Sequence, residues 1–300
     1  MNFYSAYGLT VRSAFELPEL HPVEDNNTPV DVVFERGTVE PVAKSVEGYR
    51  GRRIEADPDR CRLSYDSIGS FLVDDGKRVR FDPASEDVVG TKLVRRLFEN
   101  EMLGVLLHQR GRLVLHASAV SIDGEVALFL GPRGAGKSTT AAAFYTQGYS
   151  IMEDDIVSVR FEGQTPTVDP GVPELRLKPD AVDALGFKRT TSYPNDGNSG
   201  KRYQPLDGVP EPAPLTRCYV LRTGESLGFE PISERDRLFT LIQNTYTQGL
   251  LPDTHQTGDH FQQCSAIVET VSFRKLERPD ELIRLADLVN LVIKDVEYGD

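Results

Sequence analysis

The sequence predicts an α/β protein with a mixed, partly antiparallel sheet and a β-rich N-terminal region. Three observations support this prediction. Residues 1–85 contain short β-prone runs that alternate with turn signals such as Asp75-Gly76. Two further β-prone runs flank Asp123-Gly124, a dipeptide typical of a two-residue hairpin turn. The second of these runs leads into a glycine-rich segment and then a helix-forming run, which is the strand–loop–helix order of an α/β core.

The remaining elements follow in chain order. Residues 86–111 predict one amphipathic helix, because apolar residues recur at helical spacing and Gly111 ends the pattern. We place a domain boundary before it: residues 1–85 form a β-rich region that recognises a substrate or braces the core, and residues 86–300 form the second domain. Beyond the hairpin we expect a strand over 149–161 with an acidic interruption and a polar loop over 191–206. A strand over 217–222 and helices near 233–247 and 279–294 follow.

Composition narrows the class of protein. The net charge of -12 argues against sequence-independent binding of nucleic acid and against docking on anionic lipid, since both require a basic face. The three cysteines are far apart, so neither a disulfide framework nor a metal-ligand spacing is present. The opening lacks signal-peptide character, and no run approaches 18 apolar residues. We therefore expect a cytoplasmic protein that binds neither nucleic acid nor membrane.

A glycine-rich segment from Gly131 to Ser138 fits the Walker A pattern G-x-x-x-x-G-K-[ST] and lies between a predicted strand and a predicted helix. Glycines let backbone amides converge on phosphate oxygens, and the helix N-terminus adds a positive end. Lys137 can reach the β- and γ-phosphates, and the Ser138 hydroxyl can ligate magnesium. The alternative is an ordinary glycine turn capped by Ser138. The predicted site for ATP and Mg²⁺ comprises Gly131, Arg133, Gly134, Ala135, Gly136, Lys137, Ser138 and Thr139.

An acidic run ends the next predicted strand. Glu153 lies 16 residues after Lys137, the length of one helix and one strand, so the acidic end would approach the bound phosphates. One carboxylate can hold magnesium and another can take the proton of an acceptor hydroxyl. Because adjacent strand residues point to opposite faces, Asp154 and Asp155 divide these roles only if the strand ends or bends there. We expect Glu153 at the surface; the alternative for the pair is a solvated acidic turn.

The hairpin also assigns a position to His116. If Asp123-Gly124 is a two-residue turn, the strand register places His116 opposite Gly131, close to the phosphates or the attacking group. There it would act as an electrostatic or proton-handling residue. The alternative is a core histidine with satisfied hydrogen bonds.

Together these motifs resemble the HPr kinase/phosphorylase family, which shares its nucleotide-binding core with phosphoenolpyruvate carboxykinases. The resemblance rests on LHASAV, the Asp-Gly turn, the phosphate loop and the acidic pair one short helix later, over residues 112–180. It implies that His116 and Asp154 serve the phosphoryl transfer, and that Asp155 and Ser138 lie near the metal. Only the start of the family's E-x-R signature is present, and the layout is similar to divergent members that phosphorylate a serine of ribosomally made peptides.

The signature segment adds candidates. We place the carboxylate of Glu174 at the metal, and Arg176, Lys201 and Arg202 are candidates for contacting phosphate or acceptor. The alternatives are an exposed ion face for the strand containing Glu174 and Arg176, and a solvated loop pair for Lys201 and Arg202.

The leading functional hypothesis is a serine kinase that uses ATP and Mg²⁺ to phosphorylate a protein or peptide acceptor. The resemblance also implies self-association, so we expect a homo-oligomer. Two alternatives remain: a small-molecule kinase on the same core, and a nucleotide-binding regulator without catalysis.

Overall fold

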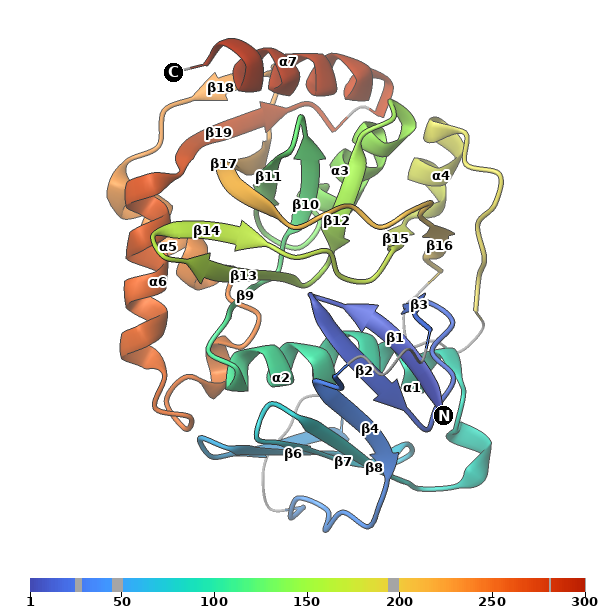
Figure 1. The fold of residues 1–300 in the computed structure, drawn as a ribbon. Helices are drawn as coiled ribbons and strands as arrows, with labels where there is room; N and C mark the ends of the chain where they lie inside the picture. Colours follow the sequence, from blue (N-terminus) through green and yellow to red (C-terminus); the bar gives the residue numbers. More distant parts are fainter. Residues whose placement is uncertain (25–28, 45–50, 194–199, 281, 300) are drawn as a thin grey trace. The chain divides into compact units, whose positions relative to one another are not determined.

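The computed structural model describes residues 1–24, 29–44, 51–193, 200–280 and 282–299. These residues form two compact units (Figure 1). The first contains residues 1–112 and 247–260, and the second contains the described residues of 113–194, 198–246 and 261–300. Helices and mixed sheets occur together, which confirms the predicted α/β class and the mixed, partly antiparallel sheet.

The first unit is built on an eight-stranded sheet in the order β3-β1-β2-β4-β8-β7-β6-β5. The pairs β2–β4 and β4–β8 are parallel and the others are antiparallel. The predicted β-rich character of this region is therefore confirmed. The strands are β1 (Asn2–Ala6), β2 (Leu9–Ser13), β3 (His21–Pro22), β4 (Val32–Arg36), β5 (Arg52–Ala56), β6 (Arg60–Tyr65), β7 (Gly69–Asp74) and β8 (Arg78–Pro83).

The helical segment after this sheet is shorter and less regular than the single helix predicted over 86–111. It comprises the 3-10 turn η2 (Glu86–Val88), α1 (Lys92–Arg96), the π-helical η3 (Leu97–Met102) and α2 (Leu103–Gln109). The Thr91 side chain accepts a hydrogen bond from the Val94 amide and so begins α1. Phe98 is fully buried against Phe15, Phe34, Phe71 and Phe81, so this segment completes the core of the first unit.

The second unit contains a nine-stranded sheet in the order β12-β10-β11-β17-β14-β13-β9, with β19 paired to β17 and β18 paired to β19. Strands β15 and β16 form a separate pair. The bounds are β9 (Leu113–Leu115), β10 (Ser118–Ile122), β11 (Glu125–Leu130), β12 (Ser150–Asp154), β13 (Val157–Glu162), β14 (Thr165–Val168), β15 (Glu174–Leu177), β16 (Arg202–Pro205), β17 (Ala213–Thr223), β18 (Gly228–Glu230) and β19 (Ser272–Arg278). Residues 194–199 of the predicted polar loop lie outside the described residues.

The β10–β11 hairpin has the predicted register. Ser118 pairs with Phe129 and Ile122 with Glu125, which leaves Asp123 and Gly124 as the turn. Both turn residues have positive φ, 50° and 83°, as a type I′ turn requires. The hairpin directs β11 to the glycine-rich segment.

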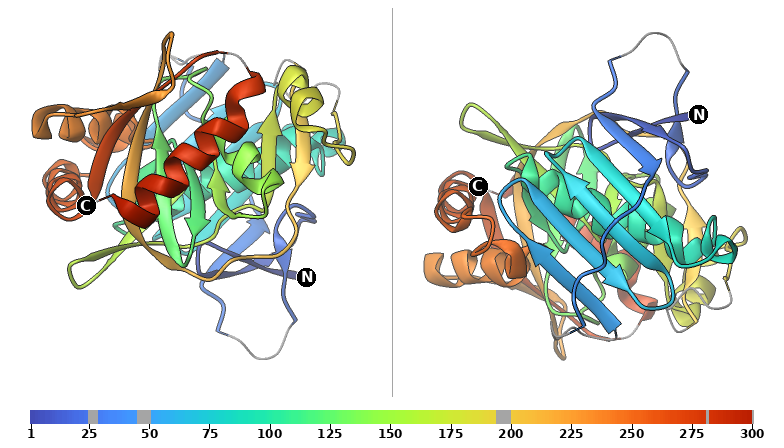
Figure 2. Two further views of the ribbon diagram at one scale, coloured as in Figure 1. Left: turned by 90° about the horizontal axis from the view of Figure 1, so that it is seen from above. Right: turned by 90° about the horizontal axis from the view of Figure 1, so that it is seen from below.

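Helices cover both faces of this sheet (Figures 1 and 2). On one face, α3 (Lys137–Thr146), α4 (Pro179–Leu185) and α7 (Leu285–Tyr298) pack on a cluster that includes Phe129 and Tyr219. On the other face, α5 (Glu234–Gln243) and α6 (Thr257–Thr270) contribute Leu241 and Ile267 to a second cluster. The short turns η4 (Gln248–Leu250) and η5 (Leu282–Arg284) complete the helical elements described. Helices α5 and α7 match the predicted helices, whereas α6 was not predicted.

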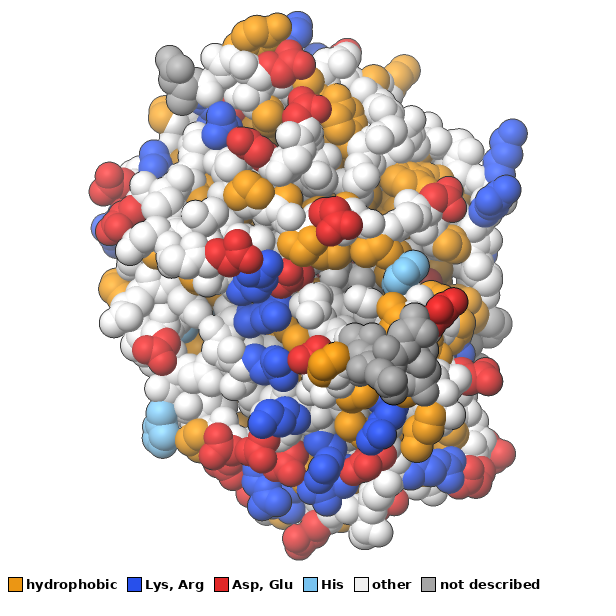
Figure 3. All heavy atoms as spheres, in the orientation of Figure 1, with side chains coloured by type: hydrophobic (Ala, Val, Ile, Leu, Met, Phe, Trp, Pro, Cys, Tyr) orange, Lys and Arg blue, Asp and Glu red, His pale blue; other side chains and the backbone are white. Residues whose placement is uncertain are grey.

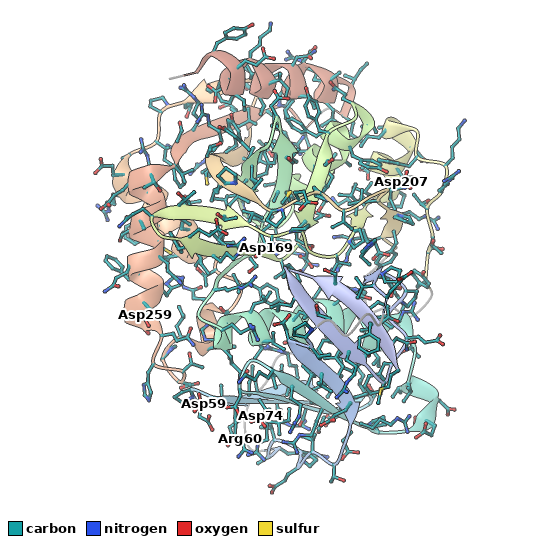
Figure 4. All side chains as sticks on the ribbon, in the orientation of Figure 1. Asp59, Arg60, Asp74, Asp169, Asp207 and Asp259 are labelled. Carbon is teal, nitrogen blue, oxygen red and sulfur yellow. The ribbon has the colours of Figure 1, made fainter. Side chains whose placement is uncertain are left out.

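The surface carries charges of both signs. Figure 3 shows acidic and basic side chains interspersed on one face, although the chain is acidic overall. Arg60 and Asp74, both labelled in Figure 4, form one such pair across β6 and β7, with 3.2 Å between Nε and Oδ1. Exposed pairs of this kind contribute little to stability. Within the described residues, no helix is long and apolar enough to span a membrane.

Candidate functional site

The glycine-rich segment joins the end of β11 to the start of α3, so the predicted strand and helix flank it. At two positions of this segment only glycine fits, because the backbone has a positive φ and a Cβ atom would lie too close to neighbouring atoms. Gly131 has φ 143°, and a Cβ there would lie 3.0 Å from the backbone oxygen of Leu221. Gly136 has φ 94°, and a Cβ there would lie 2.0 Å from a guanidinium nitrogen of Arg278. The loop backbone therefore approaches its neighbours more closely than residues with side chains would allow.

Lys137 opens α3 and is buried beneath the loop, with 7% of its surface exposed. Its Nζ donates a hydrogen bond to the Gly131 carbonyl oxygen at 2.9 Å. Burial lowers the pKa of Lys137, and the nearby charges of Asp154 and Asp155 oppose that shift. The structure thus brings the loop lysine and the acidic pair into one electrostatic cluster.

Asp154 is the last residue of β12 and is only 2% exposed. Its Oδ1 accepts a hydrogen bond from the Ser118 hydroxyl at 2.6 Å, and its Oδ2 accepts one from the Arg176 amide at 3.3 Å. The Ser138 side chain also interacts with this carboxylate. Burial raises the pKa of Asp154 and the charge of Asp155 adds to the rise, while these hydrogen bonds oppose it. Asp154 is therefore the acid of the pair that holds a proton more readily.

Asp155 lies just beyond β12, where the backbone turns sharply. Its φ is 128°, unusual for a residue other than glycine, and its amide donates to the Ala117 carbonyl oxygen at 3.0 Å. The strand therefore ends at Asp154, which meets the condition under which the two carboxylates can take different roles. The Asp155 side chain is 28% exposed, so it reaches solvent while Asp154 does not.

Two side chains hold the Asp155 carboxylate. His116 Nδ1 lies 3.1 Å from Oδ1, and an Arg176 guanidinium nitrogen lies 2.7 Å from Oδ2. Burial acts to raise the pKa of Asp155, but the hydrogen bond from His116 and the charges of Arg176, His116 and Lys201 outweigh it, so the pKa is lowered. Asp155 therefore stays anionic across the physiological range.

His116 contacts Asp155, but it does not occupy the backbone position that the hairpin register predicted. The β10–β11 ladder ends at the Ser118–Phe129 pair, so His116 is not paired with Gly131. His116 instead lies between β9 and β10, where its amide donates to the Asn244 carbonyl oxygen at 2.6 Å. The Asn244 side-chain oxygen accepts a hydrogen bond from the Gly131 amide at 3.3 Å. The two residues are thus connected through Asn244 rather than opposed across the hairpin.

No protein-family model matches this sequence, and no curated protein matches it. One similar solved structure is the Hpr(Ser) kinase/phosphatase from Coxiella burnetii. The two chains share 13% identity with a TM-score of 0.32, and the match covers 61% of this chain and 98% of the other.

Two glutamates near the acidic pair are buried. Glu153, expected at the surface, is 2% exposed, because its carboxylate accepts hydrogen bonds from the Asp154 amide at 3.0 Å and the Val172 amide at 2.5 Å. The surface prediction for Glu153 is wrong. Glu174 is 7% exposed at the start of β15, and strand alternation places it on the same face as Arg176. All four residues of β15 are buried, which rules out the exposed ion face considered from the sequence.

The neighbouring residues Lys201 and Arg202 differ in their relation to the acidic pair. Lys201 is close enough for its charge to influence the pKa of both Asp155 and Lys137, so it belongs to the cluster. Arg202 begins β16 opposite Leu177, on the face away from the one that carries Arg176. Arg133, Gly134 and Thr139 are exposed or half-buried on the loop and the first turn of α3, and Ala135 is buried.

Three residues of the site were not singled out from the sequence: Ser118, Asn244 and Arg278. Ser118 faces Asp154 across the β10–β12 pairing, a position that could have been found once β12 was placed beside β10. Asn244 and Arg278 contact the loop from 113 and 143 residues away. No local spacing in the sequence indicates contacts between residues so far apart.

Asp169, labelled in Figure 4, is a buried carboxylate outside the site. It accepts hydrogen bonds from Arg160 at 2.9 and 3.0 Å.

Proposed function

We propose that this chain is a kinase that transfers the γ-phosphoryl group of ATP to a serine hydroxyl of a protein or peptide in a magnesium-dependent reaction. The observation that carries this proposal is the placement of Asp154 and Asp155 at the end of β12 within the electrostatic reach of Lys137, the first residue after the glycine-rich loop. A nucleotide-binding loop alone would not need two acids with opposite pKa shifts beside its lysine. A substrate-recognition role for residues 1–85 is part of the proposal.

The donor set fits magnesium bound together with phosphates. Among the described residues, no group of three or more His, Cys, Asp or Glu side chains could hold a metal ion by itself. Mg²⁺ is usually held by one or two carboxylates, waters and substrate phosphates, and here Asp155, Ser138 and Glu174 supply oxygen donors. When bound, the ion would neutralise the charge of the β- and γ-phosphates. Its removal by a chelator should therefore stop transfer.

The residues of the chain bind the triphosphate, stabilise its charge and take up the proton of the acceptor. Loop amides and Lys137 hold the triphosphate, and Arg176 and Lys201 stabilise charge near the transferring group. Asp154 accepts the proton of the serine hydroxyl as the new oxygen–phosphorus bond forms and the bond to the β-phosphate oxygen breaks, which releases ADP. The raised pKa of Asp154 suits this step, and the lowered pKa of Asp155 suits a permanent anion at the metal. His116 orients Asp155 and adds positive charge when it is protonated.

The test is transfer of label from γ-labelled ATP to serine-containing peptides and proteins, in parallel with a mixture of small metabolites. We expect label on a polypeptide serine with the unmodified protein and none with Lys137→Ala. Lys294→Ala, which changes an exposed lysine of α7, should behave like the unmodified protein. Label on small molecules alone would replace the proposal with a small-molecule kinase. Undiminished transfer by Lys137→Ala would defeat the proposed use of the loop.

A further inference from the structure

A cavity of about 760 Å³ opens beside the glycine-rich loop, on the side away from the acidic pair. It is lined by residues 131–135 of the loop, residues 220–223 at the end of β17, and Thr240, Gln243 and Asn244 near the end of α5. We propose that this cavity seats the nucleoside part of the nucleoside triphosphate, while the acceptor enters on the opposite side. The inference rests on the proposed function, because it requires phosphates on the loop.

The sheet order places the cavity and the acids on opposite sides of the loop. Strand β11, which leads into the loop, has β10 and then β12 on one side and β17 on the other. β17 runs parallel to β11, with Val220 opposite Leu130, so both strands end at the same edge of the sheet. Asp154 ends β12 at that same edge, two strands from β11 in the other direction. A triphosphate on the loop would thus have the cavity at one end and the acids at the other.

The dimensions of the cavity suit a nucleoside. Its volume falls within the range of roughly 300–1,000 Å³ that is typical of small-molecule sites. The close approach of Gly131 to Leu221 makes the loop one wall of the cavity, so a ligand that fills it would also touch the loop backbone. Continuity between the phosphate-binding segment and the cavity is what a single extended nucleotide requires.

The walls combine apolar surface, hydrogen-bonding groups and positive charge. Pro132 is exposed and supplies apolar surface against which a base can pack, and the exposed Gln243 amide offers both a donor and an acceptor. Arg133 and Arg222 are cationic, and the lining, all of it within the described residues, contains no carboxylate. This charge favours a nucleoside that carries anionic phosphates next to the cavity, as the nucleoside of a triphosphate does.

Asn244 connects the two sides of the cavity that are formed by the loop and by α5. Its side-chain oxygen accepts from the Gly131 amide at 3.3 Å, and its side-chain nitrogen donates to the Thr240 carbonyl oxygen at 2.8 Å. The wall is thus fixed to the loop before any ligand arrives, which lowers the ordering cost of binding. The opposite side of the loop presents Asp154 and Asp155, whose negative charge suits a hydroxyl acceptor and a metal rather than further parts of a polyanion.

The experiment compares Mg-ATP with inorganic tripolyphosphate plus magnesium, by calorimetric titration of the whole chain. The affinity for tripolyphosphate measures binding to the loop alone. The additional affinity for ATP measures the contribution of the cavity. Thr240→Phe and Thr223→Trp each place a large side chain in the cavity, from α5 and from β17. Glu234→Phe is the matched control, since Glu234 is an exposed residue of α5 outside the lining.

We expect ATP to bind the unmodified protein more tightly than tripolyphosphate does. Each cavity-filling variant should weaken ATP binding by about tenfold or more and leave tripolyphosphate binding within about twofold, and the control should change neither. Unchanged ATP affinity in both cavity-filling variants, with tripolyphosphate still bound, would overturn the inference and leave the proposed function intact. Equal affinity of the unmodified protein for the two ligands would also overturn it. Absence of tripolyphosphate binding to the unmodified protein would reject the phosphate loop itself.

Discussion

The Arg278 guanidinium occupies the space in which a side chain on Gly136 would lie, since a Cβ on Gly136 would come within 2.0 Å of it. Arg278 ends β19 and donates to the Ala135 carbonyl oxygen from Nε at 3.3 Å and from a terminal nitrogen at 3.2 Å. Only 4% of Arg278 is exposed, and burial lowers its pKa. These contacts identify it as a residue that positions the loop.

The first prediction concerns this positioning role. Arg278→Lys keeps a positive charge but cannot reproduce the two-point contact with Ala135, so the loop should lose order. We expect the KM for ATP to rise about tenfold, equivalent to about one or two hydrogen bonds, with a smaller change in kcat. Steady-state kinetics at varied ATP would measure both. Arg284→Lys, at an exposed arginine paired with Asp287, is the control. An equal loss of kcat with unchanged KM would contradict the positioning role.

The second prediction concerns Asp154. Asp154→Asn preserves shape while removing the group that accepts the proton, so transfer should fall by about 10²- to 10⁴-fold. ATP binding should change little, because the proposed role of Asp154 is toward the acceptor hydroxyl and asparagine can still accept the hydrogen bond from Ser118. Single-turnover transfer and equilibrium nucleotide binding, measured on the same preparation, separate the two effects. Normal transfer by this variant would show that another group accepts the proton.

The third prediction concerns the metal. Asp155→Asn preserves the shape of the side chain but removes its negative charge. The magnesium concentration that gives half-maximal transfer should rise about tenfold or more. Asp207→Asn alters an acid that contacts Tyr145 and should leave the magnesium titration unchanged. A titration unaffected by Asp155→Asn would place the metal on other ligands.

The fourth prediction concerns stability at low pH. His108 in the first unit is 2% exposed, with Nε2 at 2.8 Å from the Thr254 hydroxyl and Nδ1 at 3.3 Å from the Thr247 hydroxyl. Burial, with a further contribution from the charge of His260, lowers the pKa of His108 from 6.5 to about 4. Between these values the unfolded chain binds more protons than the folded chain, so this contribution to stability is lost as pH falls from 6.5 towards 4.

Urea unfolding at pH 7.5 and pH 5 would measure this loss. The unmodified protein should lose about 2 kcal/mol more than His108→Gln does between the two conditions, since glutamine does not titrate. His21→Gln, at an exposed histidine of β3, should behave like the unmodified protein. Equal pH dependence of the unmodified protein and His108→Gln would show that His108 is not the group responsible.

Sequence patterns predicted those parts of the site that depend on neighbours along the chain. The hairpin register followed from one dipeptide, and the strand and helix around the loop followed from the Walker A motif. The separation between Lys137 and the acids predicted that they approach one another, and in the structure the charges of Asp154 and Asp155 influence the pKa of Lys137. Each of these features spans one or two elements, so spacing constrains it strongly.

The features missed depend on contacts between distant segments. His116 leaves the hairpin ladder because β9 pairs with β13, a partner that appears more than 40 residues later. Glu153 is buried where its carboxylate accepts a hydrogen bond from the Val172 amide. The residues next to Glu153 in the sequence give no sign of this contact, because Val172 lies 19 residues later. Helix α6 was missed because its first two turns, residues 257–263, are mostly polar, and its buried apolar residues Cys264 and Ile267 come only after them.

The 143-residue separation between Arg278 and Ala135 has a consequence during protein synthesis. At the roughly 5–20 residues per second at which ribosomes extend a chain, the loop emerges on the order of 10 to 30 s before the arginine that fixes it. A nascent chain would therefore lack the Arg278 contact that positions the loop until β19 has been translated. Under the proposed kinase function, such a delay would keep partly made copies from using ATP before folding is complete.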